Sequence, residues 1–126
     1  MKATILVVDD MPQIRQIMTA LLDRAGYNVI TAATFEEGKQ QADNADPDLM
    51  VVDVRLEDYN GLQLAIRERG GGSNRPVIVM SGHDDPVLVA EARRLGAEFL
   101  LKPFDRDQLL ATIERMLATS TKRSEP

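Results

Sequence analysis

Four short runs of apolar residues, most of them branched, constrain the fold of this 126-residue chain more than any other feature. They are residues 5–8, 49–52, 77–80 and 99–101, and each is apolar without interruption. Strands that are apolar on both faces are typical of parallel sheets buried between two layers of helices. A fifth segment, residues 28–32, is more mixed and predicts a strand at an edge of the sheet.

The segments between these runs have the features of helices. A spacing of three and four puts apolar side chains on one helical face, while Thr or Asp caps and glycine stops mark helix ends. The first helix has the stripe Ile14, Ile17, Met18, Leu21 and Leu22, with Gly26 after it. The second helix is marked by Thr34 with Glu37 at its start, and the third by Leu62, Ala65 and Ile66. The fourth begins at Asp85-Pro86 and ends at Gly96. The fifth begins at Asp105 and has the stripe Leu109, Leu110, Ile113, Met116 and Leu117.

Five repeats of a strand and then a helix predict an α/β fold with a doubly wound, five-stranded parallel sheet. Parallel strands need crossover connections, and helical crossovers are right-handed. Because 44% of the residues are hydrophobic, one domain of this size can bury its own core. We expect that domain to span residues 1–120, with residues 121–126 as a polar tail or the stump of a linker. The strand order does not follow from the pattern alone.

Composition and charge exclude several classes of function. The chain has no cysteine, which excludes a disulfide framework and a cysteine-ligated zinc site and fits a cytoplasmic protein. Its net charge is −5 and it has no basic stripe with interleaved aromatic residues, so we expect no direct nucleic-acid binding. No apolar run approaches the length of a membrane span, so we expect no membrane association.

Polar residues with related chemistry stand where four of the predicted strands end. They are Asp9 and Asp10 after the first strand, Asp53 at the third, Ser81 at the fourth and Lys102 after the fifth. In open α/β sheets the carboxyl ends of the strands border the functional crevice. Each residue alone has an ordinary explanation, such as the start of a helix for Asp10 or a turn for Ser81. Together they predict a shared acidic site.

This set of residues suits a magnesium ion and a transferred phosphoryl group. Crowded carboxylates repel one another, and a hard dication relieves that repulsion. Mg²⁺ prefers oxygen ligands and usually takes one or two carboxylates along with water. A lysine pairs with phosphoryl oxygens, and an aspartate can be the nucleophile that forms an acyl phosphate.

With the segment Ile-Leu-Val-Val that precedes the first two acids, these residues resemble the receiver domain of two-component response regulators, the CheY-like family, over residues 3–117. The resemblance implies a flavodoxin-like (βα)5 fold with strand order 2-1-3-4-5. It implies that Asp53 is the phosphoacceptor. It also implies that Mg²⁺ is held by Asp10, Asp53 and the backbone carbonyl of Arg55, with Asp9 acting through water or an outer contact.

The resemblance implies further roles around the acceptor. Ser81 would hydrogen-bond the phosphoryl group, and Lys102 would pair with it. The bond before Pro103 is a candidate cis peptide, an isomer essentially confined to bonds before proline. Phe99 stands where the family has its switching aromatic residue; without the resemblance it would be an ordinary strand residue.

Three positions depart from the family's usual pattern. Glu57 stands where many receivers have a proline, so we expect a more mobile loop, although Gly61 keeps the loop length. Ser81 replaces the commoner threonine and keeps its hydroxyl. Phe99 has no phenol, so an inward rotamer cannot be held by the hydrogen bond of a tyrosine.

The resemblance implies a sensor histidine kinase or a histidine phosphotransfer protein as the phosphoryl donor. The output would be a downstream protein or an attached domain, engaged through the face that the fourth helix, fifth strand and fifth helix form. A second copy of the chain, in a homodimer formed on activation, is a further expected partner. The domain would then have no enzymatic activity beyond its own phosphotransfer and autodephosphorylation.

Three alternatives remain open on the sequence. An aspartyl-nucleophile phosphatase needs a second acid two residues after its nucleophile, but Arg55 follows Asp53 and Met11 follows Asp9 at that spacing. A pseudo-receiver that only binds proteins has no need of the complete set of acids, hydroxyl and lysine. The chain can also be one domain of a transcription factor whose DNA-binding part lies elsewhere.

Two residues near the acceptor are candidates for setting how long the phosphoryl group persists. Arg55 stands two residues after Asp53, and His83 stands two residues after Ser81. Both therefore belong to loops at the mouth of the site, where water would approach the acyl phosphate. An arginine is permanently charged, and a histidine changes charge near neutral pH. The ordinary alternative is that both are solvated loop residues.

Overall fold

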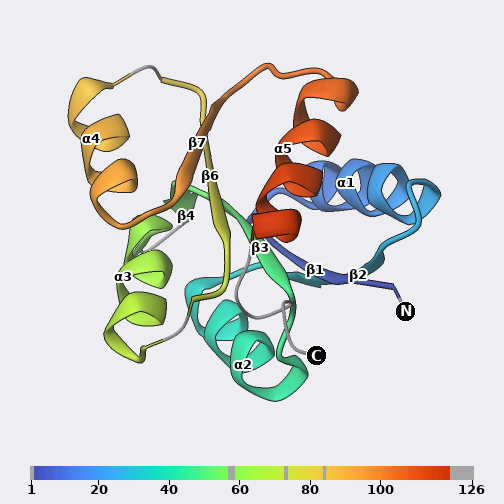
Figure 1. Cartoon of the computed structure of the whole chain (residues 1–126), viewed down its shortest axis with the longest axis horizontal. Helices are drawn as coiled ribbons and strands as arrows, with labels where there is room; N and C mark the ends of the chain where they lie inside the picture. Colours follow the sequence, from blue (N-terminus) through green and yellow to red (C-terminus); the bar gives the residue numbers. More distant parts are fainter. Residues whose placement is uncertain (1, 57–58, 73, 84, 120–126) are drawn as a thin grey trace.

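A computed structural model describes residues 2–56, 59–72, 74–83 and 85–119. Within them five parallel strands form one sheet in the order β2-β1-β3-β6-β7 (Figure 1). These strands are β1 (Thr4–Val8), β2 (Asn28–Ala32), β3 (Leu49–Asp53), β6 (Val77–Ser81) and β7 (Glu98–Leu101). Counting these five strands along the chain gives the order 2-1-3-4-5, so the predicted α/β fold and strand order are confirmed.

Helices cover both faces of the sheet. They are α1 (Pro12–Arg24), α2 (Phe35–Ala45), α3 (Leu62–Gly70), α4 (Pro86–Arg94) and α5 (Arg106–Thr119). Buried side chains of α1 and α5 pack on one face, and those of α2, α3 and α4 pack on the other (Figure 1). No helix in the described segments has the length and hydropathy needed to span a bilayer.

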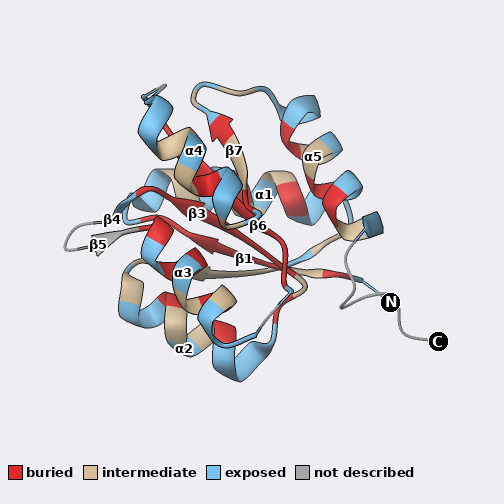
Figure 2. Ribbon diagram, turned by 60° about the vertical axis from the view of Figure 1, so that its left-hand side comes forward, coloured by how far each residue is buried: buried red, intermediate tan, exposed pale blue. Residues whose placement is uncertain are grey.

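Burial explains why the apolar runs are continuous. Every residue of β3 and β6 is buried, and so are residues 5–8 of β1. Figure 2 shows these central strands as a buried layer between the helices. At an edge of the sheet, β2 is only partly buried, which agrees with its mixed sequence. Since burial of one large aliphatic side chain stabilises by about 1.5–3 kcal/mol, the central strands contribute a large part of the hydrophobic stabilisation, together with the buried faces of the helices.

The ends of the helices follow from local interactions that the sequence predicts. Three helices have a capping side chain that accepts a hydrogen bond from a backbone N–H in the first turn: Thr34 for α2 at 3.1 Å, Asp85 for α4 at 2.9 Å and Asp105 for α5 at 2.7 Å. These bonds satisfy donors that lack partners within the helix. After α1 and α4, Gly26 and Gly96 have φ of 98° and 74°, which glycine adopts without steric penalty.

The helices marked by Ile17 and Ile66 form as predicted, but these two isoleucines are exposed. Ile17 of α1 is 59% exposed, and Ile66 of α3 is 49% exposed. Met18 and Leu22 are the buried residues of α1. Because successive residues are about 100° apart around a helix, Ile17 lies roughly 140° from Leu22. The apolar stripe is wider than the face that the sheet covers.

A short antiparallel hairpin follows β3, which the sequence pattern does not predict. Its strands are β4 (Arg55–Leu56) and β5 (Tyr59–Asn60). Glu57, where we expect a more mobile loop, lies outside the described residues. The polar residues 121–126 lie outside them as well.

A buried ion pair joins three segments at the amino end of the sheet. Arg75 and Glu68 are 7% and 5% exposed, and Arg75 Nη1 lies 2.5 Å from Glu68 Oε1. The same guanidinium donates from Nε to the Pro47 carbonyl and from Nη2 to Asp46, each at 2.7 Å. Arg75 therefore connects α3 and the segment before β6 to the turn before β3.

We expect Arg75→Met to lower the free energy of unfolding by roughly 3 kcal/mol, because the buried charge of Glu68 would keep only the longer contact with Arg67 Nη1, at 3.7 Å. Replacing both residues, with Glu68→Leu and Arg75→Met, should recover part of this loss. Urea denaturation followed by circular dichroism measures both effects. Arg94→Ala, which removes an exposed pair with Glu91, is the control and should leave the unfolding midpoint near that of wild type. A double variant no more stable than Arg75→Met would contradict this account.

Candidate functional site

The predicted polar residues meet at the carboxyl end of the sheet. Asp9 follows β1, Asp53 ends β3, Ser81 ends β6 and Lys102 follows β7. Parallel pairing brings Ser81 and Lys102 to the same edge of the sheet. The Lys102 N–H donates to the Ser81 carbonyl at 2.7 Å, which continues the register of β6 and β7. The strand order thus puts β3, which carries Asp53, between β1 and β6.

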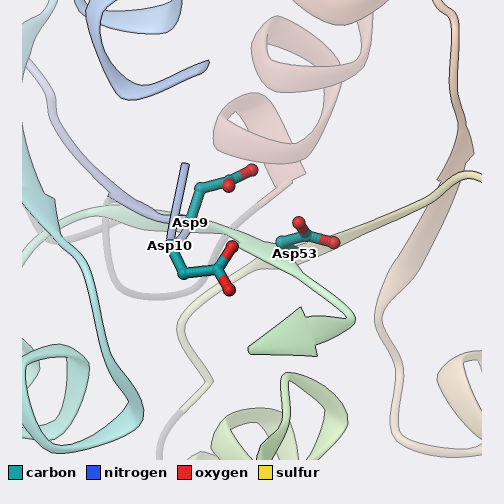
Figure 3. A group of neighbouring side chains, drawn as sticks. All are labelled: Asp9, Asp10 and Asp53. Atoms are coloured by element: carbon teal, nitrogen blue, oxygen red, sulfur yellow. The ribbon is translucent and has the colours of Figure 1, made fainter. Parts of the chain in front are cut away.

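Three carboxylates come together at this edge. Oxygens of Asp9, Asp10 and Asp53 all lie within 4.8 Å of one another. Figure 3 shows the side chains of Asp9 and Asp10 extending toward Asp53. Asp9 is fully buried, Asp53 is 6% exposed and Asp10 is exposed. A cation stabilises such an arrangement, because the acids repel one another and two of them are removed from water.

The two carboxylate oxygens of Asp9 differ in their hydrogen bonding. Its Oδ1 accepts a hydrogen bond from the Met11 N–H at 2.9 Å, whereas Oδ2 is buried and has no hydrogen-bond partner among the described residues. Burial raises the pKa of Asp9 to about 6; the bond from Met11 opposes the rise, the charge of Asp53 adds to it, and Lys102 opposes it. The buried, unpartnered oxygen marks a place for a proton or a cation.

Hydrogen bonds reach both carboxylate oxygens of Asp53. The Arg55 N–H donates to Oδ1 at 3.1 Å, and Lys102 Nζ donates to Oδ2 at 3.3 Å. Lys102 Nζ also lies 3.8 Å from Asp9 Oδ2, so one ammonium stands between the two most buried acids. Because the Lys102 side chain is 28% exposed, it has room to turn toward a group bound on Asp53.

The β4–β5 hairpin directs the backbone of Arg55 toward the acids. The Gly61 N–H donates to the Val54 carbonyl at 2.8 Å, whereas the Val54 N–H donates to the Met80 carbonyl of β6, also at 2.8 Å. Arg55 pairs with Asn60 in the hairpin. The Arg55 N–H binds Asp53 Oδ1, which brings the backbone of Arg55 next to the acceptor carboxylate.

These oxygens fit a magnesium ion. The clustered carboxylates of Asp10 and Asp53 offer hard oxygen donors, and Mg²⁺ combines one or two carboxylates with water. The unpartnered buried oxygen of Asp9 adds a negative group that a nearby dication would compensate. When bound, the ion would neutralise the acids and the charge on a transferred phosphoryl group.

Gly61 packs directly against the backbone of Asp53. A Cβ at this position would lie 2.0 Å from the Asp53 carbonyl oxygen and 2.8 Å from Cγ1 of Val52. No side chain fits there unless the segment that carries the acceptor carboxylate moves. The sequence identifies Gly61 only as a loop glycine, because the close approach that requires it is a property of the folded hairpin.

Ser81 and Phe99 project from the same face of the sheet. Ser81 is 1% exposed, and its Oγ accepts from the His83 N–H and donates to the His83 carbonyl, each at 3.1 Å. Phe99 lies opposite Val79, two residues before Ser81, and both Phe99 and Val79 pack in the core beneath α2, α3 and α4. Because alternate residues of a strand share a face, the Ser81 side chain points to that side as well.

The remaining predicted positions, Pro103, Arg55 and His83, flank the site. The peptide bond between Lys102 and Pro103 is cis. Arg55 Nη2 lies 3.3 Å from His83 Nε2, and both residues are exposed. A neutral histidine can accept this hydrogen bond, whereas a protonated one offers only donors to the guanidinium. The structure thus brings together two residues that are 28 positions apart in the sequence.

We expect Asp9→Asn to stabilise the fold in the absence of divalent cations, by an amount that depends on pH. The pKa is about 6 in the folded chain against 3.8 for an ordinary aspartate, so protonation of Asp9 stabilises the folded state. That contribution is fully present below pH 3.8 and is lost as the pH rises through about 6. The stability gap between variant and wild type should therefore grow over this range, to roughly 2–3 kcal/mol.

Urea unfolding in the presence of a chelator, repeated from acidic to mildly alkaline pH, measures this gap. Saturating Mg²⁺ should reduce it, because the cation compensates the charge of Asp9 in wild type. Asp107→Asn, at a position that is 94% exposed, is the control and should show no comparable change. A gap that does not vary with pH would contradict the description of Asp9 as the uncompensated acid.

Comparisons with known sequences agree with this geometry. The pattern of the response regulator receiver domain matches residues 5–114. The chain is 37% identical to the transcriptional regulatory protein FixJ of Bradyrhizobium diazoefficiens, over 99% of this chain and 60% of that protein. It is 36% identical to the DNA-binding transcriptional regulator NtrC of Azospirillum brasilense, over 94% of this chain and 25% of that protein. It therefore spans less than two thirds of the length of these relatives.

Solved structures share the fold. The chemotaxis response regulator CheY4 of Vibrio cholerae is 31% identical, with a TM-score of 0.84 over 92% of this chain and 99% of that chain. A CheY-like response regulator receiver domain protein from Methanospirillum hungatei is 26% identical, with a TM-score of 0.91 over 98% of this chain and 100% of that chain.

Proposed function

Because the chain belongs to the response regulator receiver domain family, in which phosphorylation on an aspartate is the general property, we propose that Asp53 is the phosphoacceptor here. The observation that carries the proposal is the environment of Asp53. Its carboxylate ends a buried strand beside two further acids and accepts a hydrogen bond from Lys102 at 3.3 Å. Asp10, Asp53 and the Arg55 carbonyl would hold Mg²⁺, with Asp9 acting through water or an outer contact.

The donor in this proposal is a phosphohistidine on a sensor histidine kinase or a histidine phosphotransfer protein. An oxygen of Asp53 attacks the phosphorus, the bond from phosphorus to the imidazole nitrogen breaks, and the imidazole leaves with a proton from solvent. Lys102 can follow the incoming phosphoryl oxygens, because it already binds Asp53. The Ser81 hydroxyl can exchange its hydrogen bond to the His83 carbonyl for one to a phosphoryl oxygen.

The output of the proposed switch is the surface formed by α4, β7 and α5. Val87 of α4 and Leu101 of β7 are large apolar residues that are 70% and 41% exposed. A downstream protein, an attached domain or a second copy of the chain would bind there after phosphorylation. FixJ and NtrC are transcriptional regulators by name, which supports transcriptional control as the output. The cytoplasmic location expected from the sequence belongs to the same proposal.

The competing functions have less support. In the position where an aspartyl phosphatase needs its second acid, Arg55 instead directs its guanidinium to His83. A module that only binds proteins would not require Lys102 between two buried acids. We therefore assign the domain no reaction other than its own phosphotransfer and autodephosphorylation.

We expect one phosphoryl group per chain on incubation with a small acyl phosphate and Mg²⁺, and none in the presence of a chelator. Intact-mass spectrometry measures the added group. Asp53→Asn should abolish it because the nucleophilic oxygen is lost, whereas Asp107→Asn, which changes an exposed aspartate of α5, should leave it unchanged. Equal labelling of Asp53→Asn and wild type would exclude Asp53 as the acceptor.

We expect Ser81 and Phe99 to couple phosphorylation to the output surface. When the Ser81 hydroxyl turns to the phosphoryl group, space opens on the face of the sheet where Phe99 lies, so a local charge change biases a packing change. Ser81→Ala should still be labelled but should show smaller chemical-shift changes in α4 and β7 on phosphorylation. NMR responses on this surface that are equal in wild type and Ser81→Ala would rule out the coupling.

We expect Arg55 and His83 to set the lifetime of phosphorylated Asp53. Their contact stands at the mouth of the site, so either residue can guide or obstruct the attacking water. Arg55→Ala should change the decay rate several-fold without preventing phosphorylation. His83→Ala should make the decay rate depend less on pH near neutrality, because alanine cannot take up or release a proton at the mouth of the site.

Decay followed by mass spectrometry after removal of the donor measures both effects. Arg24→Ala, at the exposed end of α1, is a matched control for the loss of a surface arginine. If wild type and both variants decay at the same rate with the same pH profile, Arg55 and His83 are ordinary loop residues.

A further inference from the structure

An arginine outside the acidic site donates a hydrogen bond to the backbone of one of the clustered acids. Arg15, near the start of α1, is partly buried and donates from Nη1 to the carbonyl oxygen of Asp9 at 2.7 Å. Hydrogen bonds with a charged donor are shorter and roughly twice as strong as neutral ones. This contact joins a helix to the residue that follows β1, at the point where the chain enters the site.

Three hydrogen bonds together fix the orientation of Asp9. Its N–H donates to the Ala32 carbonyl at 3.1 Å, its Oδ1 accepts from the Met11 N–H at 2.9 Å, and its carbonyl accepts from Arg15. The other carboxylate oxygen, Oδ2, then faces the acidic site and lies 3.8 Å from Lys102 Nζ. The direction of this carboxylate is therefore set by contacts outside the acidic cluster.

The same contact restrains Asp10. The carbonyl of Asp9 and the nitrogen of Asp10 belong to one planar peptide unit, so holding the Asp9 oxygen also fixes the direction in which the chain continues to Asp10. One residue further on, the Met11 carbonyl accepts hydrogen bonds from the Ile14 and Arg15 N–H groups, each at 3.1 Å. Met11, which precedes α1, provides no side-chain cap, in contrast to Thr34 at the start of α2. Arg15 therefore acts on two of the three clustered acids at once.

We propose that Arg15 is a positioning residue for the divalent cation: by holding the Asp9 carbonyl, it orients the carboxylates of Asp9 and Asp10 and so sets the affinity of the site for Mg²⁺. The inference rests on the proposed function, in which these acids bind the ion. Residues that orient metal ligands from outside typically alter metal affinity by about 10- to 100-fold. Because Arg15 acts through one backbone oxygen, we expect its effect on the Mg²⁺ affinity to be near tenfold, the lower end of this range.

The test is calorimetric titration of the whole chain with MgCl₂, without any phosphoryl donor. Arg15→Met keeps the apolar stem and removes the donor, so it should raise the Mg²⁺ dissociation constant about tenfold. Arg15→Lys restores a charged donor and should recover most of the affinity. Arg24→Met removes an exposed arginine from the last turn of the same helix and should bind as wild type does. Unfolding in a chelator is measured in parallel for each variant.

The outcomes separate this inference from the function on which it rests. If wild type binds Mg²⁺ and Arg15→Met binds within twofold of it, Arg15 only stabilises α1 and the inference is wrong. If Arg15→Met does not fold, Arg15→Ala, which also removes the donor, takes its place, and wild-type affinity in that variant overturns the inference. If wild type itself binds no Mg²⁺, the cation site fails, and the role of Arg15 fails with it.

Discussion

Repulsion between Asp9 and Asp53 is the constraint around which the site is arranged. Both carboxylates are withdrawn from water at the end of the sheet, and the exposed carboxylate of Asp10 adjoins them. Lys102 compensates part of this charge from 3.3 and 3.8 Å, but Asp9 Oδ2 accepts no hydrogen bond from the described residues, and the pKa of Asp9 stays raised. A pocket that holds more negative charge than its own cation balances is suited to a metal ion and to a transferred phosphoryl group.

The fold makes this crowding unavoidable once the sequence is in place. Because β3 lies between β1 and β6, Asp53 must end beside Asp9 on one side and Ser81 on the other. The hairpin after β3 then returns close enough that Gly61 packs against the Asp53 carbonyl. The packing of Gly61 against Asp53 thus restrains the backbone of the acceptor, so the Asp53 carboxylate has little freedom to move away from its neighbours.

The sequence predicts the strands, the caps of the helices and the residues at the strand ends, because each depends on local pattern. It does not predict which part of a wide apolar stripe faces the sheet, as the exposed Ile17 and Ile66 show. It also does not reveal contacts between distant segments. The pair of Arg75 with Glu68, the clearance at Gly61 and the bond from Arg15 to Asp9 each depend on backbones brought together by folding.

The most direct test of the account is a crystal structure of the chain with Mg²⁺ and beryllium fluoride, which mimics a phosphoryl group. The account predicts beryllium fluoride bonded to an oxygen of Asp53, with Lys102 Nζ and Ser81 Oγ turned to its fluorines. It predicts the ion on Asp10, Asp53 and the Arg55 carbonyl. Beryllium fluoride on another carboxylate, or an ion that avoids these oxygens, would contradict it.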